Sequence, residues 1–318
     1  MQRQRSLPFL VGGGVLMTTL FIWQALIAQE RAYIQQETQL AAESVENELV
    51  AGMESRIQAL VRMSKRWERR GKTLKDDWEF EAGLNIRDIK GFQAIQWVDP
   101  SFRVRWIVPL SGNQASLNMN LAFSPQRRAS LEVARNRRDV TVTHSIDLVQ
   151  GGKGFLVDIP IFQGETFSGF IVGVFRTITV LDTILEGGKN VASGYGYTIA
   201  IFDGEEEIYR HDSGNKQYEQ EWNQETKINL HGTTWRVRVW PTAKLLTELQ
   251  SPLPNVVFVG GLLMALLLAL AIHLAQKARL RAGQAELANI ELENEIAERK
   301  RTETLLTHIV TGSENNDG

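Results

Sequence analysis

Two long apolar segments, residues 8–28 and 255–275, bracket a region of mixed polarity that is about 226 residues long. Each segment has 21 residues, and a helix of that length crosses the hydrocarbon core of a bilayer, which is roughly 30 Å thick. The second segment contains no Asp, Glu, Lys or Arg, and in lipid a helix satisfies the backbone hydrogen-bonding groups internally. The pattern predicts two transmembrane helices.

The first segment has an alternative interpretation, because a basic start followed by an apolar stretch is also typical of a cleaved signal peptide. Its apolar stretch is longer than the core of a usual signal peptide, and Leu26-Ile27-Ala28 is a poor cleavage site. The sequence therefore favours a retained membrane anchor.

Basic residues flank the two segments on their outer sides, where cytoplasmic flanks of membrane helices carry an excess of Lys and Arg. These residues are Arg3, Arg5, Lys277, Arg279 and Arg281. We therefore expect residues 1–7 to be a cytoplasmic amino terminus. Residues 29–254 are expected in the periplasm, with the protein in the inner membrane of a bacterium.

A single apolar stripe runs along residues 29–72, which predicts one long helix outside the cytoplasm. Its members recur at spacings of three, four and seven, as on one face of a helix. They are Ile34, Ala41, Val45, Leu49, Met53, Ile57, Leu60 and Trp67. The stripe predicts either core packing or a dimer seam, and both interpretations remain open at this point.

Residues 73–186 change to short runs typical of β-strands, which we expect to form an antiparallel sheet. The expected strands are residues 92–98, 102–110, 140–149, 154–162 and 167–177. In the first hairpin, Phe102, Val104, Trp106 and Val108 are predicted to share one face. Ser124 and Pro125 predict the start of a helix that reaches about residue 138. The acidic run Asp76, Asp77, Glu79 and Glu81 is interpreted as a solvated connecting segment.

Residues 187–254 predict a second, smaller sheet that follows a connecting helix near residues 179–186. Its expected strands are residues 195–202, 205–211, 227–230 and 233–240, and Asp203-Gly204 is a hairpin signal between the first two. The predicted fold class is α+β, with a long amino-terminal helix followed by two antiparallel-sheet subdomains.

The chain beyond the second apolar segment shows an imperfect heptad pattern over residues 276–310. Leu280, Leu287, Asn294 and Arg301 lie seven residues apart, which predicts a coiled-coil signalling helix in a homodimer. An exposed single helix is the alternative. Residues 311–318 have the polar composition of a linker.

Composition narrows the possible functions. The net charge is −2 and no basic stripe occurs, so we expect no nucleic-acid partner. The chain has no cysteine, which excludes disulfides and thiolate metal sites. The five histidines lack metal-ligand spacing, and no convergent acid, base and nucleophile can be recognised. We therefore expect no metal, no cofactor and no enzymatic activity.

Four segments in order resemble the CHASE domain, a sensory domain found outside the membrane in sensor kinases and cyclases. They are FQAIQWVD (residues 92–99), RWIVP (105–109), QGGKGFLVDIPIF (150–162) and GFIVGVFR (169–176). The resemblance covers about residues 78–177. It implies a long helix followed by two PAS-like subdomains, a membrane-distal one at residues 73–186 and a membrane-proximal one at residues 187–254. It also implies that the distal subdomain holds the ligand pocket.

Strand alternation and this family layout together select candidate ligand-binding residues. They are Trp97, Trp106, Val108, Phe155, Val157, Ile171 and Gly173, with Thr143 as a polar contact. Arg105 and Arg176 are candidates for gripping an anionic ligand. Ordinary core packing is the alternative for the apolar residues, and a solvated surface is the alternative for the two arginines.

Together these patterns predict a receptor module that binds an unknown small molecule outside the cytoplasm. The signal would cross the membrane to a cytoplasmic output domain of the histidine kinase or diguanylate cyclase type, as in a two-component system. That domain is absent from this chain and would act in cis or in trans. A regulatory membrane protein without a ligand is one alternative function, and a membrane-tethered enzyme is another.

Overall fold

The computed structural model describes residues 7–71, 73–187, 196–211 and 216–314, and these divide between two compact units. One unit comprises Arg31–Gln250, and the other comprises Met1–Glu30 with Ser251–Gly318. Residues 1–6 of the expected amino terminus, residues 188–195 after the connecting helix and residues 315–318 of the expected linker lie outside the described residues.

Helix α2 (Leu7–Arg70) ends at Arg70, close to the predicted end of the long helix, and its stripe is core. Each of the eight stripe residues named above is at most 3% exposed within the single chain. Burying a large apolar side chain contributes about 1.5–3 kcal/mol, so this stripe anchors the helix to the sheets. Of the two interpretations left open, the structure shows core packing.

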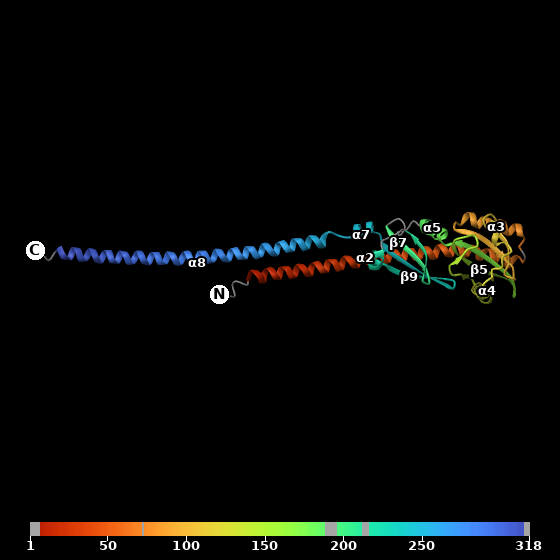
Figure 1. Cartoon of the computed structure of the whole chain (residues 1–318), viewed down its shortest axis with the longest axis horizontal. Coiled ribbons are helices and arrows are strands. Elements are labelled where there is room, and N and C mark those ends of the chain that lie inside the picture. The colour runs from red at the N-terminus through yellow and green to blue at the C-terminus, as the bar shows by residue number, and fades with distance from the viewer. Residues whose placement is uncertain (1–6, 72, 188–195, 212–215, 315–318) are drawn as a thin grey trace. The chain divides into compact units, whose positions relative to one another are not determined.

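The first sheet has six antiparallel strands in the order β2-β1-β6-β5-β3, with β4 paired to β5. Strand β5 is labelled in Figure 1. The strands are β1 (Phe92–Val98), β2 (Val104–Val108), β3 (Thr141–Val142), β4 (Ile146–Asp147), β5 (Lys153–Gln163) and β6 (Thr166–Arg176). A short 3-10 helix, η1 (Gln114–Ser116), lies in the connection after β2. These strands agree with the predicted runs within a few residues, except that the run 140–149 divides into two short strands.

The first sheet has two apolar faces. Phe155 and Val157 of β5 belong to the main core with α2, whereas the intervening Leu156 belongs to a second cluster with Leu131 and Ala134 of α4 (Pro125–Arg137). Strand alternation places successive side chains on opposite faces. We call the face that packs on α2 the α2 face, and the face that packs on α4 the α4 face. Alternate residues of β5 point to these two faces.

Helix α3 (Lys75–Asp88) replaces the connecting segment expected around the acidic run. Trp78 and Ala82, four residues apart, are buried, and the first-turn Asp76 and Asp77 are favourable beside the positive end of the helix dipole. Glu81 forms an ion pair with Arg66 of α2. The prediction of a connecting segment was wrong because a short helix needs only one apolar edge, which the charges obscured.

A bulge corrects the predicted face of β2. Trp97 pairs with Trp106, but Val98 pairs with Val104, so Arg105 is the extra residue. Trp106 and Val108 therefore pack on the α2 face, while Val104 and Phe102 pack on the α4 face. The four residues do not share one face, as strict alternation predicted.

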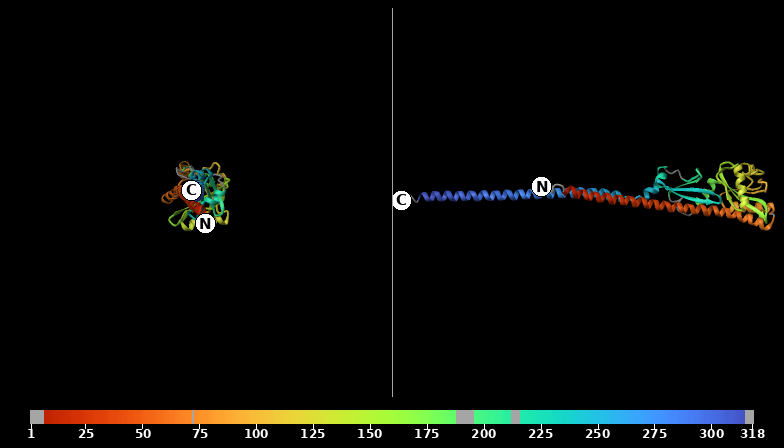
Figure 2. Two further views of the ribbon diagram at one scale, coloured as in Figure 1. Left: turned by 90° about the vertical axis from the view of Figure 1, so that its left-hand side faces the viewer. Right: turned by 90° about the horizontal axis from the view of Figure 1, so that it is seen from below.

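The second sheet has four antiparallel strands in the order β8-β7-β10-β9. They are β7 (Tyr197–Asp203), β8 (Glu206–His211), β9 (Gln224–Leu230) and β10 (Thr233–Pro241). Helices α5 (Thr177–Gly187), α6 (Lys216–Trp222) and α7 (Ala243–Leu249) accompany them, and α6 was not predicted. One face shares the core with α2, which runs along both sheets (Figure 2).

The other unit contains the start of α2 and helix α8 (Leu253–Glu314). Among the described residues, α2 and α8 are each long and apolar enough to cross a membrane. Within this unit the Trp23 and Phe258 ring centroids lie 5.2 Å apart. Helix α8 continues through residue 314, which extends it into the segment predicted as a linker.

Candidate functional site

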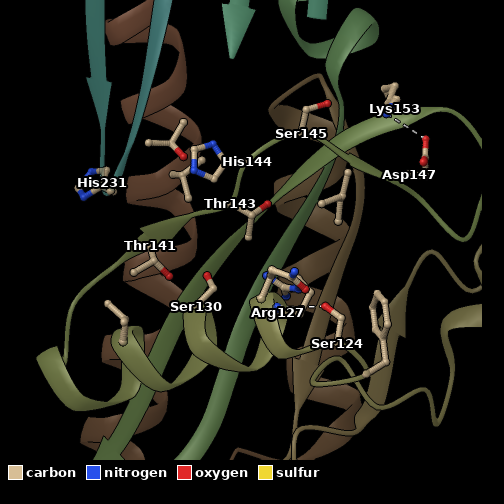
Figure 3. A pocket seen from close by; sticks show the side chains of 17 residues that line it. Ser124, Arg127, Ser130, Thr141, Thr143, His144, Ser145, Asp147, Lys153 and His231 are labelled. Carbon is tan, nitrogen blue, oxygen red and sulfur yellow. Dashed lines mark hydrogen bonds and ion pairs between the residues drawn. The ribbon is translucent and has the colours of Figure 1, made fainter. Parts of the chain in front are cut away.

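A cavity of about 600 Å³ lies beside helix α4, and we call it the α4 cavity. Three parts of the chain line it: α4 with the residues just before it, the β3–β4 segment with Lys153, and the tip of the β9–β10 hairpin (Figure 3). The first two parts belong to the region of the first sheet, and the third belongs to the second sheet. A ligand in this cavity would touch both.

Local sequence fixes the position of α4. The Ser124 side chain accepts a hydrogen bond from the Arg127 backbone N–H at 3.2 Å, and Pro125 occupies the first turn. Serine at the cap satisfies a backbone donor that the helix cannot. Because the helix begins here, Arg127 and Ser130 lie on the side of α4 that lines the cavity, whereas Ala129 is exposed to solvent.

A buried ion pair joins α4 to the first sheet. The Arg127 Nη1 and Nη2 groups donate to Asp158 Oδ2 at 3.1 Å and Oδ1 at 3.4 Å. The Arg127 Nε–H has no hydrogen-bond partner among the described residues, although the atom is buried. An unpaired buried donor costs about 1–3 kcal/mol, so the described residues leave this N–H uncompensated.

A smaller cavity of about 40 Å³ adjoins the α4 cavity on the same face of the sheet. The two cavities share Phe123, Arg127, Ile146 and Asp147 in their linings. Gln96 of β1 lines the smaller one, is 2% exposed, and its Oε1 atom accepts no hydrogen bond from the described residues. The α4 face therefore presents an unpaired acceptor near an unpaired donor.

The β3–β4 segment connects the cavity to the second sheet through Asp203 at the end of β7. The His144 Nδ1 atom lies 2.7 Å from Asp203 Oδ1, and the Ser145 N–H donates to Asp203 Oδ2 at 2.7 Å. Thr143, one residue earlier, accepts a hydrogen bond from the Leu156 N–H at 2.9 Å. Lys153 lies 3.1 Å from Glu206 and 3.3 Å from Asp147, and hydrogen bonds to Glu206 and then Asp147 raise the pKa of Lys153.

The tip of the β9–β10 hairpin is held at the cavity from two sides. His231 Nε2 lies 2.8 Å from Glu54 Oε1 of α2, and the His231 carbonyl accepts from the Val142 N–H at 3.0 Å. His231 and Gly232 both have positive φ, at 39° and 102°, which tightens the turn. This geometry brings Thr233 into the cavity lining.

The predicted ligand residues fall into two groups. Thr143 lines the α4 cavity. The other seven belong to the α2 face or, for Gly173, contact it: Trp97, Trp106, Val108, Phe155, Val157, Ile171 and Gly173. Trp67 of α2 stacks on Trp97, with ring centroids 5.3 Å apart, and these seven residues line neither cavity. Their proposed contact with a ligand stays a prediction.

The two predicted anion-binding arginines have partners within the protein. Arg105 Nε donates to Asp99 Oδ2 at 2.6 Å. Arg176 Nε donates to Gln93 Oε1 at 2.8 Å, and its Nη2 donates to the Gln150 carbonyl at 2.9 Å. Neither arginine lines the α4 cavity.

Sequence reasoning missed Gln96, Arg127, Asp158 and His231. Gln96 and Asp158 each interrupt an apolar strand, and a polar residue in such a run is a usable signal for a buried polar contact. Arg127 and His231 carried no such signal, because their roles depend on tertiary contacts. In the part of the chain that the structure describes, no group of three or more His, Asp or Glu side chains could hold a metal ion.

Comparison with protein-family models matches residues 45–212, just over half of the chain, to the CHASE domain. The chain belongs to the CHASE-domain family. The CHASE domain is an extracellular sensory domain, so residues 45–212 form a sensory region. The matched region includes every strand of the first sheet, and the family indicates a sensory region rather than a catalytic one.

Several solved structures resemble this chain at low sequence identity. An extracellular ligand binding receptor from Desulfohalobium retbaense is 13% identical, with a TM-score of 0.51 over 64% of this chain and 39% of that receptor. The ligand-binding domain of the Pseudomonas aeruginosa chemoreceptor PctC, in complex with GABA, is 14% identical, with a TM-score of 0.44 over 65% of this chain and 99% of that domain. The sensory domain of Campylobacter jejuni Tlp3 with isoleucine bound is 8% identical, with a TM-score of 0.47 over 69% and 97% of the two chains.

At 13% identity, the similarity to the Desulfohalobium retbaense receptor concerns the fold alone. This chain covers 39% of the length of that receptor. A comparison of the sequence with curated proteins finds no significant match.

Proposed function

We propose that this CHASE protein is a bacterial inner-membrane receptor that binds a small molecule in the α4 cavity and signals through α7 and α8. The observation that carries this proposal is the cavity itself, which lies beside the buried Arg127–Asp158 pair and presents unpaired polar groups. Pockets of 300–1,000 Å³ with a few placed polar groups are typical of small-molecule sites. A ligandless regulatory protein would have no need of such a cavity.

The β9–β10 hairpin provides a connection from the cavity toward α8. Its tip lines the cavity, and the far end of β10 leads to Thr242. Thr242 caps α7 through its side chain, which accepts from the Leu245 N–H, and its own N–H donates to the Gly196 carbonyl at 2.7 Å. A ligand that favours one position of the hairpin would therefore bias α7. Differential affinity for two arrangements is what a signal requires.

The proposal also includes the finer organisation expected from the sequence. Residues 73–186 and 187–254 would be two PAS-like subdomains in the periplasm, and residues 276–310 would pair with a second copy as a coiled coil. The output would be a histidine kinase or diguanylate cyclase, in cis or in trans, and this chain would itself catalyse no reaction. Leu280 and Leu287 are exposed in the single chain, as residues of a dimer seam should be.

Filling the cavity tests the site. Thermal unfolding of the full chain in lipid nanodiscs, screened against a metabolite library, should identify compounds that raise the melting temperature, since a binder stabilises the folded state. Ser130→Trp should abolish that effect by occupying the cavity. Ala129→Trp is the matched control, because Ala129 precedes Ser130 on α4 but is exposed. Equal responses in both variants would contradict this location.

Crosslinking tests the dimer separately. The chain has no cysteine, so Leu280→Cys and Leu287→Cys each give one thiol per chain. Both should crosslink between copies in membranes, while Ala285→Cys, on the outer side of the same heptads, should react poorly. No crosslink at either leucine would contradict the coiled coil.

A further inference from the structure

The basic side chains that line the α4 cavity have carboxylate partners within the protein. Arg127 pairs with Asp158, and Lys153 with Asp147 and Glu206. The two histidines also lie beside carboxylates, His144 beside Asp203 and His231 beside Glu54. Each basic group of the lining therefore already faces a carboxylate. A charged ligand would have to compete with these partners and would gain little net attraction.

Hydroxyl groups, by contrast, are left unpaired at the cavity. Residues Thr141 and Thr233 are 9% and 2% exposed, and their Oγ1 atoms are buried with no hydrogen-bond partner among the described residues. The Oγ atom of Ser145 is also buried without a partner there. A hydroxyl both donates and accepts, so such groups match ligand groups that do the same.

The unpaired groups come from both sheets. Thr141 of β3 lies next to Ser130 of α4 in the cavity lining, and Thr143 and His144 follow along the same segment (Figure 3). Thr233 belongs to the second sheet, at the hairpin tip. Val133 and Val142 supply apolar surface in the same lining. The cavity can therefore hold a molecule that is polar at its edges, carries no charge and reaches both sheets.

We propose that the α4 cavity takes a small neutral molecule with several hydroxyl groups, of the sugar or polyol class, and that Thr141 and Thr233 bind it from the two sheets. This assignment rests on the proposed function, since it names the ligand class of the same site. It adds Thr233, a residue of the second sheet, to the ligand contacts. The ligand then bridges the sheets, and its departure removes a direct connection between them.

Neutral probes and charged counterparts of one of them test the ligand class. Thermal unfolding of the full chain in nanodiscs is measured with neutral D-glucose, D-ribose, glycerol and myo-inositol. D-Gluconate and D-glucosamine are the anionic and cationic counterparts of glucose. At least one neutral probe should raise the melting temperature in a saturable way, and its charged counterparts should bind at least tenfold more weakly. Saturable stabilisation by the charged probes alone would overturn the class.

Isosteric variants test the contacts. Thr141→Val and Thr233→Val each remove one hydroxyl but keep the branched shape. Because that hydroxyl has no partner without ligand, stability should stay the same or rise, while neutral-probe affinity should fall at least tenfold. Thr198→Val is the matched control: Thr198 is fully buried, its Oγ1 is also unpaired among the described residues, and it lines neither cavity. Equal affinity in all three variants would overturn the assigned contacts.

The outcomes separate the two proposals. If only the charged probes bind, and Ser130→Trp abolishes that binding, the neutral class is wrong but the receptor site stands. If no probe and no library compound stabilises the protein, the proposed function fails and the ligand class fails with it.

Discussion

Arg127 and Asp158 form an ion pair that is almost completely shielded from water, with side-chain exposures of 5% and 0%. Two hydrogen bonds, of 3.1 and 3.4 Å, connect helix α4 to strand β5 through this pair. Two buried charges are tolerated only together, because each alone would lose its hydration without compensation. The pair therefore fixes the position of the helix that forms one wall of the α4 cavity.

Breaking this pair should be costly. Arg127→Met leaves the Asp158 carboxylate buried without a partner, and we expect the free energy of unfolding to fall by about 3–5 kcal/mol. Chemical denaturation of the full chain measures this change. The double variant Arg127→Met with Asp158→Leu should recover most of the loss, because no charge remains buried. If the double variant recovers none of the lost free energy of unfolding, this explanation is contradicted.

An exposed pair provides the control for that experiment. Arg138 pairs with Glu165, whose side chain is 88% exposed. Exposed pairs are worth about 0–1 kcal/mol, so Arg138→Met should change the free energy of unfolding very little. A similar loss in both arginine variants would mean that burial does not set the cost.

Asp99 should make the stability of the first hairpin depend on pH. Burial acts to raise the pKa of Asp99, but hydrogen bonds from Ser101, Arg105 and Arg103 outweigh it and leave that pKa below the ordinary value. The unfolded carboxyl has a pKa of about 3.9. The ionised form stabilises the folded state, so this contribution is present above pH 3.9 and is lost as the pH falls through the folded pKa.

Asp99→Asn should therefore destabilise the protein at neutral pH and not in acid. We expect a loss of at most about 1 kcal/mol at pH 7, since Arg105 is partly exposed to solvent. The difference between wild type and variant should shrink toward zero at pH 3 and below. The measurement is denaturant unfolding of both proteins at the two pH values, and a difference that grows in acid would show the wrong sign.

Local signals in the sequence were sufficient for most of the fold. Ser124 and Pro125 specified the start of α4, and Asp203-Gly204 specified the turn between β7 and β8, because caps and tight turns depend on a few neighbouring residues. The α2 stripe specified a long helix because its apolar residues recur at helical spacing. Helix α3 was missed because only Trp78 and Ala82 mark its buried edge.

The location of the cavity could not be predicted in the same way. Alternation along β5 separates Phe155 and Val157 from Leu156 and Asp158, but it does not say which set meets the long helix. The apolar set was chosen as the ligand wall, and it packs against α2. The bulge at Arg105 depends on pairing between two strands, so no pattern in β2 alone reveals it.

Gly173 provides a test of the α2 face. A Cβ atom added there would lie 2.6 Å from the Leu60 Cδ1 atom and 2.9 Å from the Phe175 ring. Gly173→Ala should therefore lower the free energy of unfolding by about 1–3 kcal/mol through overpacking. Adding Leu60→Val should restore part of that loss, because a shorter side chain frees the space. A loss of ligand affinity with unchanged stability would instead support the predicted ligand role.

Gly83 is the matched glycine control. It lies within α3, and a Cβ atom added there meets nothing within 4 Å. Alanine is favoured over glycine in a helix interior by about 0.5–1 kcal/mol. Gly83→Ala should accordingly stabilise the protein, opposite in sign to Gly173→Ala in the same unfolding assay.

The two apolar helices can be tested through Gly12 and Ala269. A Cβ atom added to Gly12 would lie 3.4 Å from the Ala269 Cβ, whereas one added to Gly13 meets nothing within 4 Å. A disulfide needs Cβ atoms about 3.5–4.5 Å apart. In this cysteine-free chain, Gly12→Cys with Ala269→Cys should oxidise within one chain in membranes. Thiol labelling should fall from two groups to none while the monomer persists on a non-reducing gel. Gly13→Cys with Ala269→Cys should retain its thiols, and equal oxidation of both pairs would contradict this packing of α2 against α8.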